Sequence, residues 1–146
     1  MLPKWYSSFS VHTATIDEQH KKLFELADKV EIITDRSVSK NEVKELLAEF
    51  FNYMEDHFND EDKYMQLIAY PAFEEHKIIH KEIIQTMINL IKDIKSTNDL
   101  KEKRYIIAIK WPLEHILYED MKVEKWRSSS LATDEGKDAS FEAADV

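Results

Sequence analysis

Apolar residues recur every three or four positions through most of this chain, the spacing that places them on one face of an α-helix. The longest run covers residues 43–68, and a second covers 73–94. Shorter runs cover 16–33 and 106–126. Four amphipathic helices are therefore predicted, and their apolar faces are best buried against one another.

Polar segments between the runs predict where the first two helices begin. Thr15 and Ser39 each precede a glutamate by three positions. This is the spacing of a capping box, in which both side chains bind backbone groups at a helix start. We expect the first helix to run from Thr15 to about Arg36 and the second from Ser39 to about Ile68.

Prolines and a short polar connection define the remaining helices. Pro71 fits the first position of a third helix, where its missing N–H costs nothing, and we expect that helix to end near Lys95. Residues 96–99 offer capping side chains, after which 106–126 supply the fourth helical segment. Pro112 lies inside this segment. The segment either begins in earnest at this proline or continues through it with a kink.

The two ends of the chain lack helical periodicity. Residues 1–14 carry large apolar side chains without helical phase, so we expect an extended arm whose aromatic residues pack across the helices. From Arg127 the chain becomes polar and acidic, and 127–146 are predicted to form a disordered tail. Residues 15–126 then form one all-α domain, an up-down-up-down four-helix bundle.

The composition supports this fold class and narrows the possible functions. One glycine and three prolines in 146 residues argue against a sheet protein rich in tight turns. The net charge is −9 and no cluster of basic residues forms a stripe, so nucleic acid is not an expected partner. The absence of cysteine excludes disulfides, thiolate zinc sites and iron–sulfur clusters. Because no signal peptide or membrane-spanning run is present, we expect a cytoplasmic protein with no membrane partner.

Several ionisable residues occupy positions on the predicted apolar faces. His57 and Glu61 stand four residues apart on the second helix, and His76 and His80 repeat that step on the third. Each pair therefore projects from one side of its helix. An unpaired carboxylate in a core is costly, because desolvation disfavours its charged form. A buried metal ion held by nitrogen and oxygen is the simplest explanation.

A single histidine in a core is more often a hydrogen-bonded packing residue than a metal ligand. Here five histidines lie on helical faces that can point inward, together with acidic residues, and this number favours a metal site. The five are His20, His57, His76, His80 and His115. His12 is separate from them, and we interpret it as a surface histidine of the arm.

Four segments of the chain resemble the hemerythrin family, and bacterial hemerythrins in particular. They are IDEQHKKLF around His20, HFNDEDKYM from His57, YPAFEEHKIIH ending at His80 and WPLEHILYED ending at Asp120. The resemblance covers nearly all of residues 5–126 and fills the seven ligand positions of the family in order. His12 is a departure, because it stands where the family usually has glycine. The resemblance implies two iron ions joined by an oxo or hydroxo bridge, with dioxygen as a reversibly bound ligand.

The same resemblance assigns a role to each candidate ligand. One iron would be held by His76, His80 and His115, and the other by His20 and His57. Glu61 and Asp120 would bridge the two. The iron with three histidines would be coordinatively full, and the other would keep an open position for dioxygen. The pocket at that position would be walled by Leu23, Phe58, Trp111 and Ile116, with Pro112 able to reshape it.

One spacing conflicts with α-helical geometry. Five residues of α-helix from His115 to Asp120 turn by about 500°, which leaves the two side chains about 140° apart. Glu119, four residues after His115, would share the histidine's face. Geometry alone favours Glu119 as the ligand. The resemblance favours Asp120, which we adopt.

Other metal proteins fit the sequence less well. A zinc protease would need the HExxH motif, and five histidines exceed a four-ligand zinc site. A ferritin-like di-iron enzyme would need Glu-x-x-His pairs, which do not occur in this chain. We therefore expect oxygen storage, delivery or sensing and no enzyme activity beyond a weak peroxidase or oxidase side reaction. The alternatives are a di-iron oxidase, a scavenger of peroxide or nitric oxide, and a signalling module that responds to oxygen or iron. A protein partner, and the choice between monomer and homo-oligomer, are left open.

Overall fold

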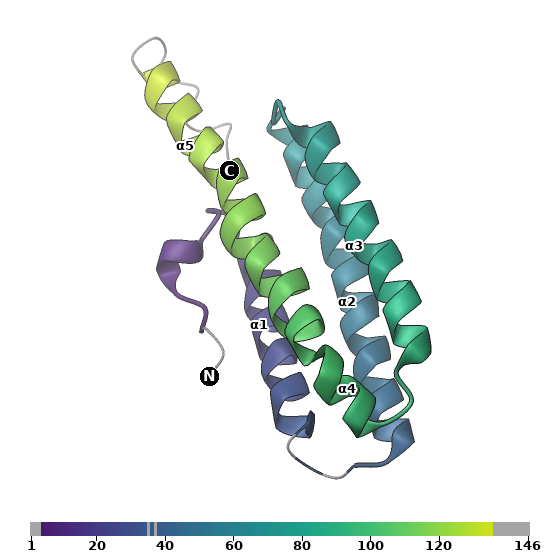
Figure 1. Ribbon diagram of the computed structural model, residues 1–146. Helices are drawn as coiled ribbons and strands as arrows, with labels where there is room; N and C mark the ends of the chain where they lie inside the picture. Colours follow the sequence, from purple (N-terminus) through teal and green to yellow (C-terminus); the bar gives the residue numbers. More distant parts are fainter. Residues whose placement is uncertain (1–3, 35, 37, 136–146) are drawn as a thin grey trace.

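The computed structural model describes residues 4–34, 36 and 38–135, and it confirms the predicted all-α four-helix bundle (Figure 1). Three rods are α1 (Ala14–Thr34), α2 (Lys40–Leu67) and α3 (Phe73–Asp93). The fourth is continuous and consists of α4 (Thr97–Arg104), the π-helical segment η2 (Tyr105–Asp120) and α5 (Met121–Glu135). A short 3₁₀ helix, η1 (Ser7–Phe9), precedes them. No helix within these ranges is long and apolar enough to cross a membrane.

The core follows the predicted three-four periodicity along each rod. Val30 on α1, Val43 and Phe50 on α2, and Leu100 on α4 are fully buried. Each side chain of this size contributes about 1.5–3 kcal/mol when it is removed from water. The same inward faces carry the candidate ligands, so the packing of the apolar residues also fixes where the ligands point.

Serine side chains cap two helices as predicted. Ser39 accepts a hydrogen bond from the backbone N–H of Glu42 at 3.2 Å, and Ser96 accepts one from Asp99 at 3.1 Å. Each bond satisfies an N–H group that has no partner inside its helix. These caps therefore define where α2 and α4 begin.

The start of α1 differs from the prediction. The helix begins at Ala14, one residue early, and Thr15 already lies inside it. Asp17 ties the incoming chain to the helix, because its carboxylate accepts hydrogen bonds from the Val11 N–H at 2.8 Å and the Ser10 hydroxyl at 2.5 Å. The side chain that fixes this helix start is therefore Asp17.

The turn between α2 and α3 shows why Pro71 is not the first residue of a helix. Ala69 has a φ of 56°, in the left-handed region, and the Tyr70 N–H donates to the carbonyl of Met65 at 3.0 Å. This is the long bond of a Schellman motif, which ends α2. Pro71 lies in the turn that follows, and α3 begins at Phe73, two residues later than predicted.

Pro112 neither begins a helix nor breaks one. It lies inside η2, where the turns are π-helical and hydrogen bonds run from residue i to i+5. Proline lacks an N–H and its ring clashes with the carbonyl four residues earlier in an α-helix. A π-helical turn relieves this conflict. Of the two predictions for this segment, the structure therefore favours the one in which the helix continues through Pro112, and it adds a π-helical middle that was not predicted.

The N-terminal arm packs against α1, although Ser7–Phe9 form a 3₁₀ turn within it. The ring of Phe9 stacks on Phe24 with 6.2 Å between centroids, and the Lys21 ammonium lies 4.6 Å from the ring centre of Trp5. Arm aromatics therefore cover one side of the bundle.

Helix α5 continues past Trp126, where the sequence placed the end of the bundle, and reaches Glu135. Arg127 is 9% exposed and forms an ion pair with Glu124, with Nε 2.7 Å from a carboxylate oxygen. The imidazole of His12 meets the same carboxylate. These contacts fix the helix at Arg127, one residue past the predicted end of the bundle. The remainder of the predicted disordered tail, 136–146, lies outside the described residues.

Candidate metal centre

The seven predicted ligands come together inside the bundle, and every rod contributes at least one. None is more than 4% exposed. His20 comes from α1, and His57 and Glu61 come from α2. The others, on α3 and η2, are His76, His80, His115 and Asp120.

The potential ligand atoms form two overlapping groups. The larger, here called the five-ligand group, consists of Glu61, His76, His80, His115 and Asp120. The smaller, here called the four-ligand group, consists of His20, His57, Glu61 and Asp120. Within each group the ligand atoms all lie within 4.8 Å of one another, and each group could hold one metal ion. Glu61 and Asp120 are the two shared carboxylates.

Glu61 directs one oxygen to each group. Its Oε1 lies 3.0 Å from Nε2 of His80 and 3.3 Å from Nε2 of His76. Its Oε2 lies 3.2 Å from Nε2 of His20 and 3.3 Å from Nε2 of His57. A carboxylate held in this way can bridge two cations.

Asp120 is divided between the groups in the same manner. Its Oδ1 lies 2.9 Å from Nε2 of His115 and 3.0 Å from Nε2 of His76, in the five-ligand group. Its Oδ2 lies 3.1 Å from Nε2 of His20, in the four-ligand group. Both shared carboxylates therefore lie between the same two sets of imidazoles.

The π-helical backbone explains how Asp120 reaches the cluster five residues after His115. Because hydrogen bonds in η2 connect residues five apart, side chains at that spacing lie on nearly the same face. Glu119 points elsewhere, and its carboxylate lies 3.2 Å from the ammonium of Lys122 at the surface. The α-helical calculation that favoured Glu119 assumed the wrong kind of turn.

The cluster contains buried polar atoms that no protein group satisfies. Nε2 of His57, Oε1 of Glu61 and Oδ2 of Asp120 have no hydrogen-bond partner, although other ligand atoms lie nearby. Each unsatisfied buried group costs about 1–3 kcal/mol. The nitrogens of His80 and His115 also approach to 2.9 Å. Cations would satisfy these converging lone pairs, and a set of imidazoles and carboxylates suits iron.

Two ligand histidines are oriented by side chains outside the cluster. Nδ1 of His57 lies 2.8 Å from Oε1 of Gln19, whose amide donates to Asp60 at 2.7 Å. Nδ1 of His80 lies 2.9 Å from a carboxylate oxygen of Asp62. A proton on Nδ1 leaves Nε2 free to bind metal. Sequence alone could not assign these partners, because they depend on how the rods are rotated.

The two buried carboxylates of the cluster attract positive charge, as the pKa values of the neighbouring histidines indicate. Burial lowers the pKa of His20, but hydrogen bonds and attraction to the two shared carboxylates outweigh burial and raise it to about 9. The same balance raises the pKa of His76 to about 10 and that of His115 to about 9. Burial lowers the pKa of His57, which the carboxylates only partly oppose. Protonated imidazoles thus supply positive charge to a site built around two anions.

The predicted pocket residues are all buried beside this cluster or in the adjoining core. They are Leu23, Phe58, Trp111, Pro112 and Ile116. The ring of Phe58 stacks on His80 with centroids 3.9 Å apart and presents its edge toward His115 at 5.3 Å. Phe58 therefore forms an apolar wall directly against the ligands. His12, in contrast, has a side chain 64% exposed and lies outside both groups, and its φ of 58° suits the glycine expected there.

Comparison with known proteins indicates the same family that the sequence motifs resemble. The family model described as Hemerythrin HHE cation binding domain matches residues 11–126. Bacteriohemerythrin from Campylobacter jejuni is 32% identical over 118 residues, which cover 80% of this chain and 89% of that protein. Bacteriohemerythrin from Clostridium acetobutylicum is 31% identical over 125 residues, covering 80% and 94%. Myohemerythrin from Theromyzon tessulatum is 29% identical over 119 residues, covering 82% and 88%. With a family match across most of its length and a cluster of the matching chemistry in its core, this chain belongs to the hemerythrin family.

Proposed function

We propose that this protein binds dioxygen reversibly at a di-iron centre formed by the seven clustered residues. The observation that carries the proposal is the pair of unequal ligand groups joined by two shared carboxylates. Two groups can hold two ions, and the shared carboxylates would keep those ions close enough to act on one ligand. The names of the relatives, bacteriohemerythrin and myohemerythrin, support the same assignment.

In this proposal each protein ligand has a defined position. His76, His80 and His115 hold one iron, and His20 and His57 hold the other. Glu61 and Asp120, which belong to both groups, would be shared by the two irons. When bound, the iron pair supplies the electrons that dioxygen binding requires. Because the four-ligand group has one protein ligand fewer, the open position is assigned to that side, as in a metal site that keeps a place for an exogenous ligand.

The protein's contribution to reversibility is a dry and chemically inert wall. Phe58 packs on the ligand rings, and Leu23 and Ile116 are each 1% exposed within the same core. Such a wall excludes water and anions that would compete with dioxygen. None of these side chains can donate a proton, so the residues favour release of dioxygen over its reduction. We therefore assign no catalytic residue and propose storage, delivery or sensing of oxygen as the role.

Anaerobic loading with ferrous iron, followed by metal analysis and absorption spectroscopy, tests this function. We expect about two irons per chain and a visible band that appears with oxygen and disappears when oxygen is removed. Zinc-loaded protein is the control, because zinc has no redox chemistry and should give no such band. Rapid, irreversible oxidation of the iron would instead support an oxidase or a scavenger, and a single bound ion would contradict the di-iron assignment.

A further inference from the structure

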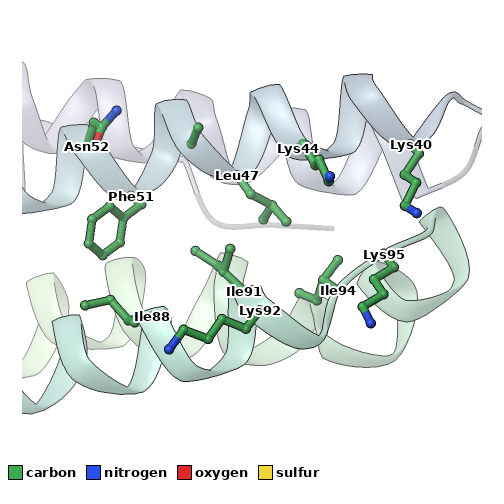
Figure 2. Close-up of a pocket in the computed structure, with 11 residues that line it drawn as sticks. Lys40, Lys44, Leu47, Phe51, Asn52, Ile88, Ile91, Lys92, Ile94 and Lys95 are labelled. Carbon is green, nitrogen blue, oxygen red and sulfur yellow. The ribbon is translucent and has the colours of Figure 1, made fainter.

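An apolar groove of about 550 Å³ runs between α2 and α3, on the part of these helices remote in sequence from their metal ligands (Figure 2). Its apolar lining consists of Leu47, Ala48, Phe51, Ile88, Ile91 and Ile94. None of the seven clustered ligands lines it. Its volume lies within the roughly 300–1,000 Å³ typical of small-molecule sites.

The groove exists because the two helices do not cover each other's apolar residues here. Leu47 and Ile94 are buried and form its floor. Phe51, Ile88 and Ile91 remain only half-buried, although Phe51 and Ile91 pack against the core. Large apolar side chains that face each other across an uncovered recess gain further free energy when an apolar ligand fills it.

Four exposed lysines border this apolar recess: Lys40, Lys44, Lys92 and Lys95. Among the described residues none of the four forms an ion pair. This concentration of unpaired cations is notable in a chain whose net charge is −9. The rim is therefore complementary to an anion.

Helix stability does not account for Lys40 and Lys44. They stand four residues apart on α2, where like charges repel. Lys40 also lies in the first turn of the helix, where its dipole disfavours cations. Both effects oppose these residues in the free protein, and a bound anion would relieve both. The lysines are thus better explained by a ligand than by the fold.

The groove has two chemically different ends. Figure 2 shows Lys40 and Lys95 close together at one end, whereas Phe51 and Ile88 face each other at the opposite end, with the Lys92 ammonium beside Ile88. A ligand that matches this polarity has one anionic head and one apolar chain. An acidic amphipathic helix would instead require cations in similar number along the whole groove, whereas Lys92 is the one lining lysine whose ammonium lies beside Ile88. A membrane surface would require apolar side chains that protrude.

We propose that the groove between α2 and α3 binds a long-chain carboxylate, with its head among Lys40, Lys44 and Lys95 and its alkyl chain extending toward Phe51 and Ile88. The site goes beyond oxygen binding and does not depend on it, because the two sites share no residue. A fatty-acid anion of about 12 to 16 carbons is the expected ligand class, since the recess has the volume of a small-molecule site.

Calorimetric titration of the full-length, iron-loaded protein with sodium tetradecanoate, below its micellar concentration, tests the proposal. We expect saturable binding of one anion per chain. The double variant Lys44→Gln/Lys95→Gln should bind at least tenfold more weakly. The matched control is Lys63→Gln/Lys81→Gln, which removes two exposed lysines from the other halves of α2 and α3 and should change affinity less than twofold. Equal effects of the two double variants would overturn the proposal.

Chain length and a groove variant test the apolar half of the site. Each fully buried methylene changes affinity by about fourfold, so dodecanoate should bind up to about 15-fold more weakly than tetradecanoate. Ile88→Ser should reduce that difference while leaving the helical circular dichroism unchanged. Dodecyltrimethylammonium, a cation with a similar chain, should not bind.

Three results would contradict this assignment. One is the absence of saturable binding by tetradecanoate. Another is self-association that Lys44→Gln/Lys95→Gln abolishes, since the groove would then be an interface between copies of this chain. The third is sedimentation with anionic phospholipid vesicles without binding of the monomeric carboxylate, which would make the lysines a membrane contact.

Discussion

The two ligand groups of the metal centre share both carboxylates but differ in their other residues. The five-ligand group adds three histidines from α3 and η2, and the four-ligand group adds two from α1 and α2. Their outer partners differ as well. His80 in the five-ligand group meets the carboxylate of Asp62, whereas His57 in the four-ligand group meets the neutral amide of Gln19.

We expect these differences to make one group hold its ion firmly and the other leave its ion accessible. More ligands and an anionic partner favour a firmly held, saturated ion on the five-ligand side. Fewer ligands and a neutral partner favour an accessible ion on the four-ligand side. An asymmetric pair of sites thus arises from four rods that follow the same apolar periodicity. The following experiments test whether the two groups behave differently.

The largest effect is expected when a shared carboxylate is lost. Asp120→Ala removes one ligand from each group and leaves the imidazoles of His20 and His115 with Glu61 as their remaining carboxylate partner. We expect less than one iron per chain by metal analysis, with the helical circular dichroism retained. Glu119→Ala is the matched control, because this neighbouring carboxylate pairs with Lys122 and belongs to neither ligand group. Iron loss in Glu119→Ala with full occupancy in Asp120→Ala would reverse the assignment.

Loss of a histidine from the four-ligand group should abolish oxygen binding while one iron is still bound. His57→Ala removes half of the histidines of the four-ligand group and leaves the five-ligand group complete. We expect about one iron to remain per chain and the oxygen-dependent absorption band to disappear. An unaltered oxygenated spectrum would show that dioxygen does not bind on this side.

The helices, and the faces on which the candidate ligands lie, were largely predictable from sequence. The three-four periodicity placed Ile16, His20 and Leu23 on one inward face, and each is buried in the structure. Capping by Ser39 and Ser96 was also predictable, because a cap depends on residues only three positions apart. Local pattern therefore defined the rods and which of their faces carry the ligands.

The π-helical turns of η2 could not be predicted in this way. The spacing from His115 to Asp120 was a warning, since it fits no α-helical face, and Pro112 lies shortly before it. A local pattern identifies the conflict but does not choose the backbone that resolves it, because that choice depends on packing between rods. The contacts of Gln19 with His57 and of Asp62 with His80 could not be predicted for the same reason. The two residues of each contact are 38 and 18 positions apart in the chain, respectively.

Proton release during iron loading should also distinguish the groups. In the metal-free cluster the pKa is raised to about 10 for His76 and about 9 for His115 in the five-ligand group, and to about 9 for His20 in the four-ligand group. These imidazoles carry protons at pH 7.5 and must lose them to bind metal. The five-ligand group should therefore release about two protons and the four-ligand group about one.

Anaerobic calorimetry in buffers of different ionisation enthalpy measures this release. Because the pKa values are raised, iron affinity should increase as the pH rises from 7 toward 9 and level off above about 10. The helical signal provides the control for unfolding at the highest pH. Affinity that stays constant from pH 7 to 9 would show that these histidines are already neutral in the metal-free protein.

The smallest effect is expected from the outer partners, and it tests the comparison most directly. Asp62→Ala removes an anionic acceptor from His80 and should weaken iron binding at the five-ligand group by about 10–100-fold. Gln19→Ala removes a neutral acceptor from His57 and should weaken the four-ligand group by about tenfold, at the lower end of that range. Ferrous titration against a competing chelator measures both steps.

An exchange of the two partners' charges should then make the groups more alike. Asp62→Asn keeps an oxygen acceptor near His80 but removes its charge, and Gln19→Glu places a charge beside His57. Because the Gln19 amide also donates to Asp60, Gln19→Glu is combined with Asp60→Asn to avoid two facing carboxylates. If the partner's charge sets how firmly each iron is held, iron affinity should fall at the five-ligand group and rise at the four-ligand group. Unchanged affinities in both variants would leave the number of ligands as the sole origin of the asymmetry.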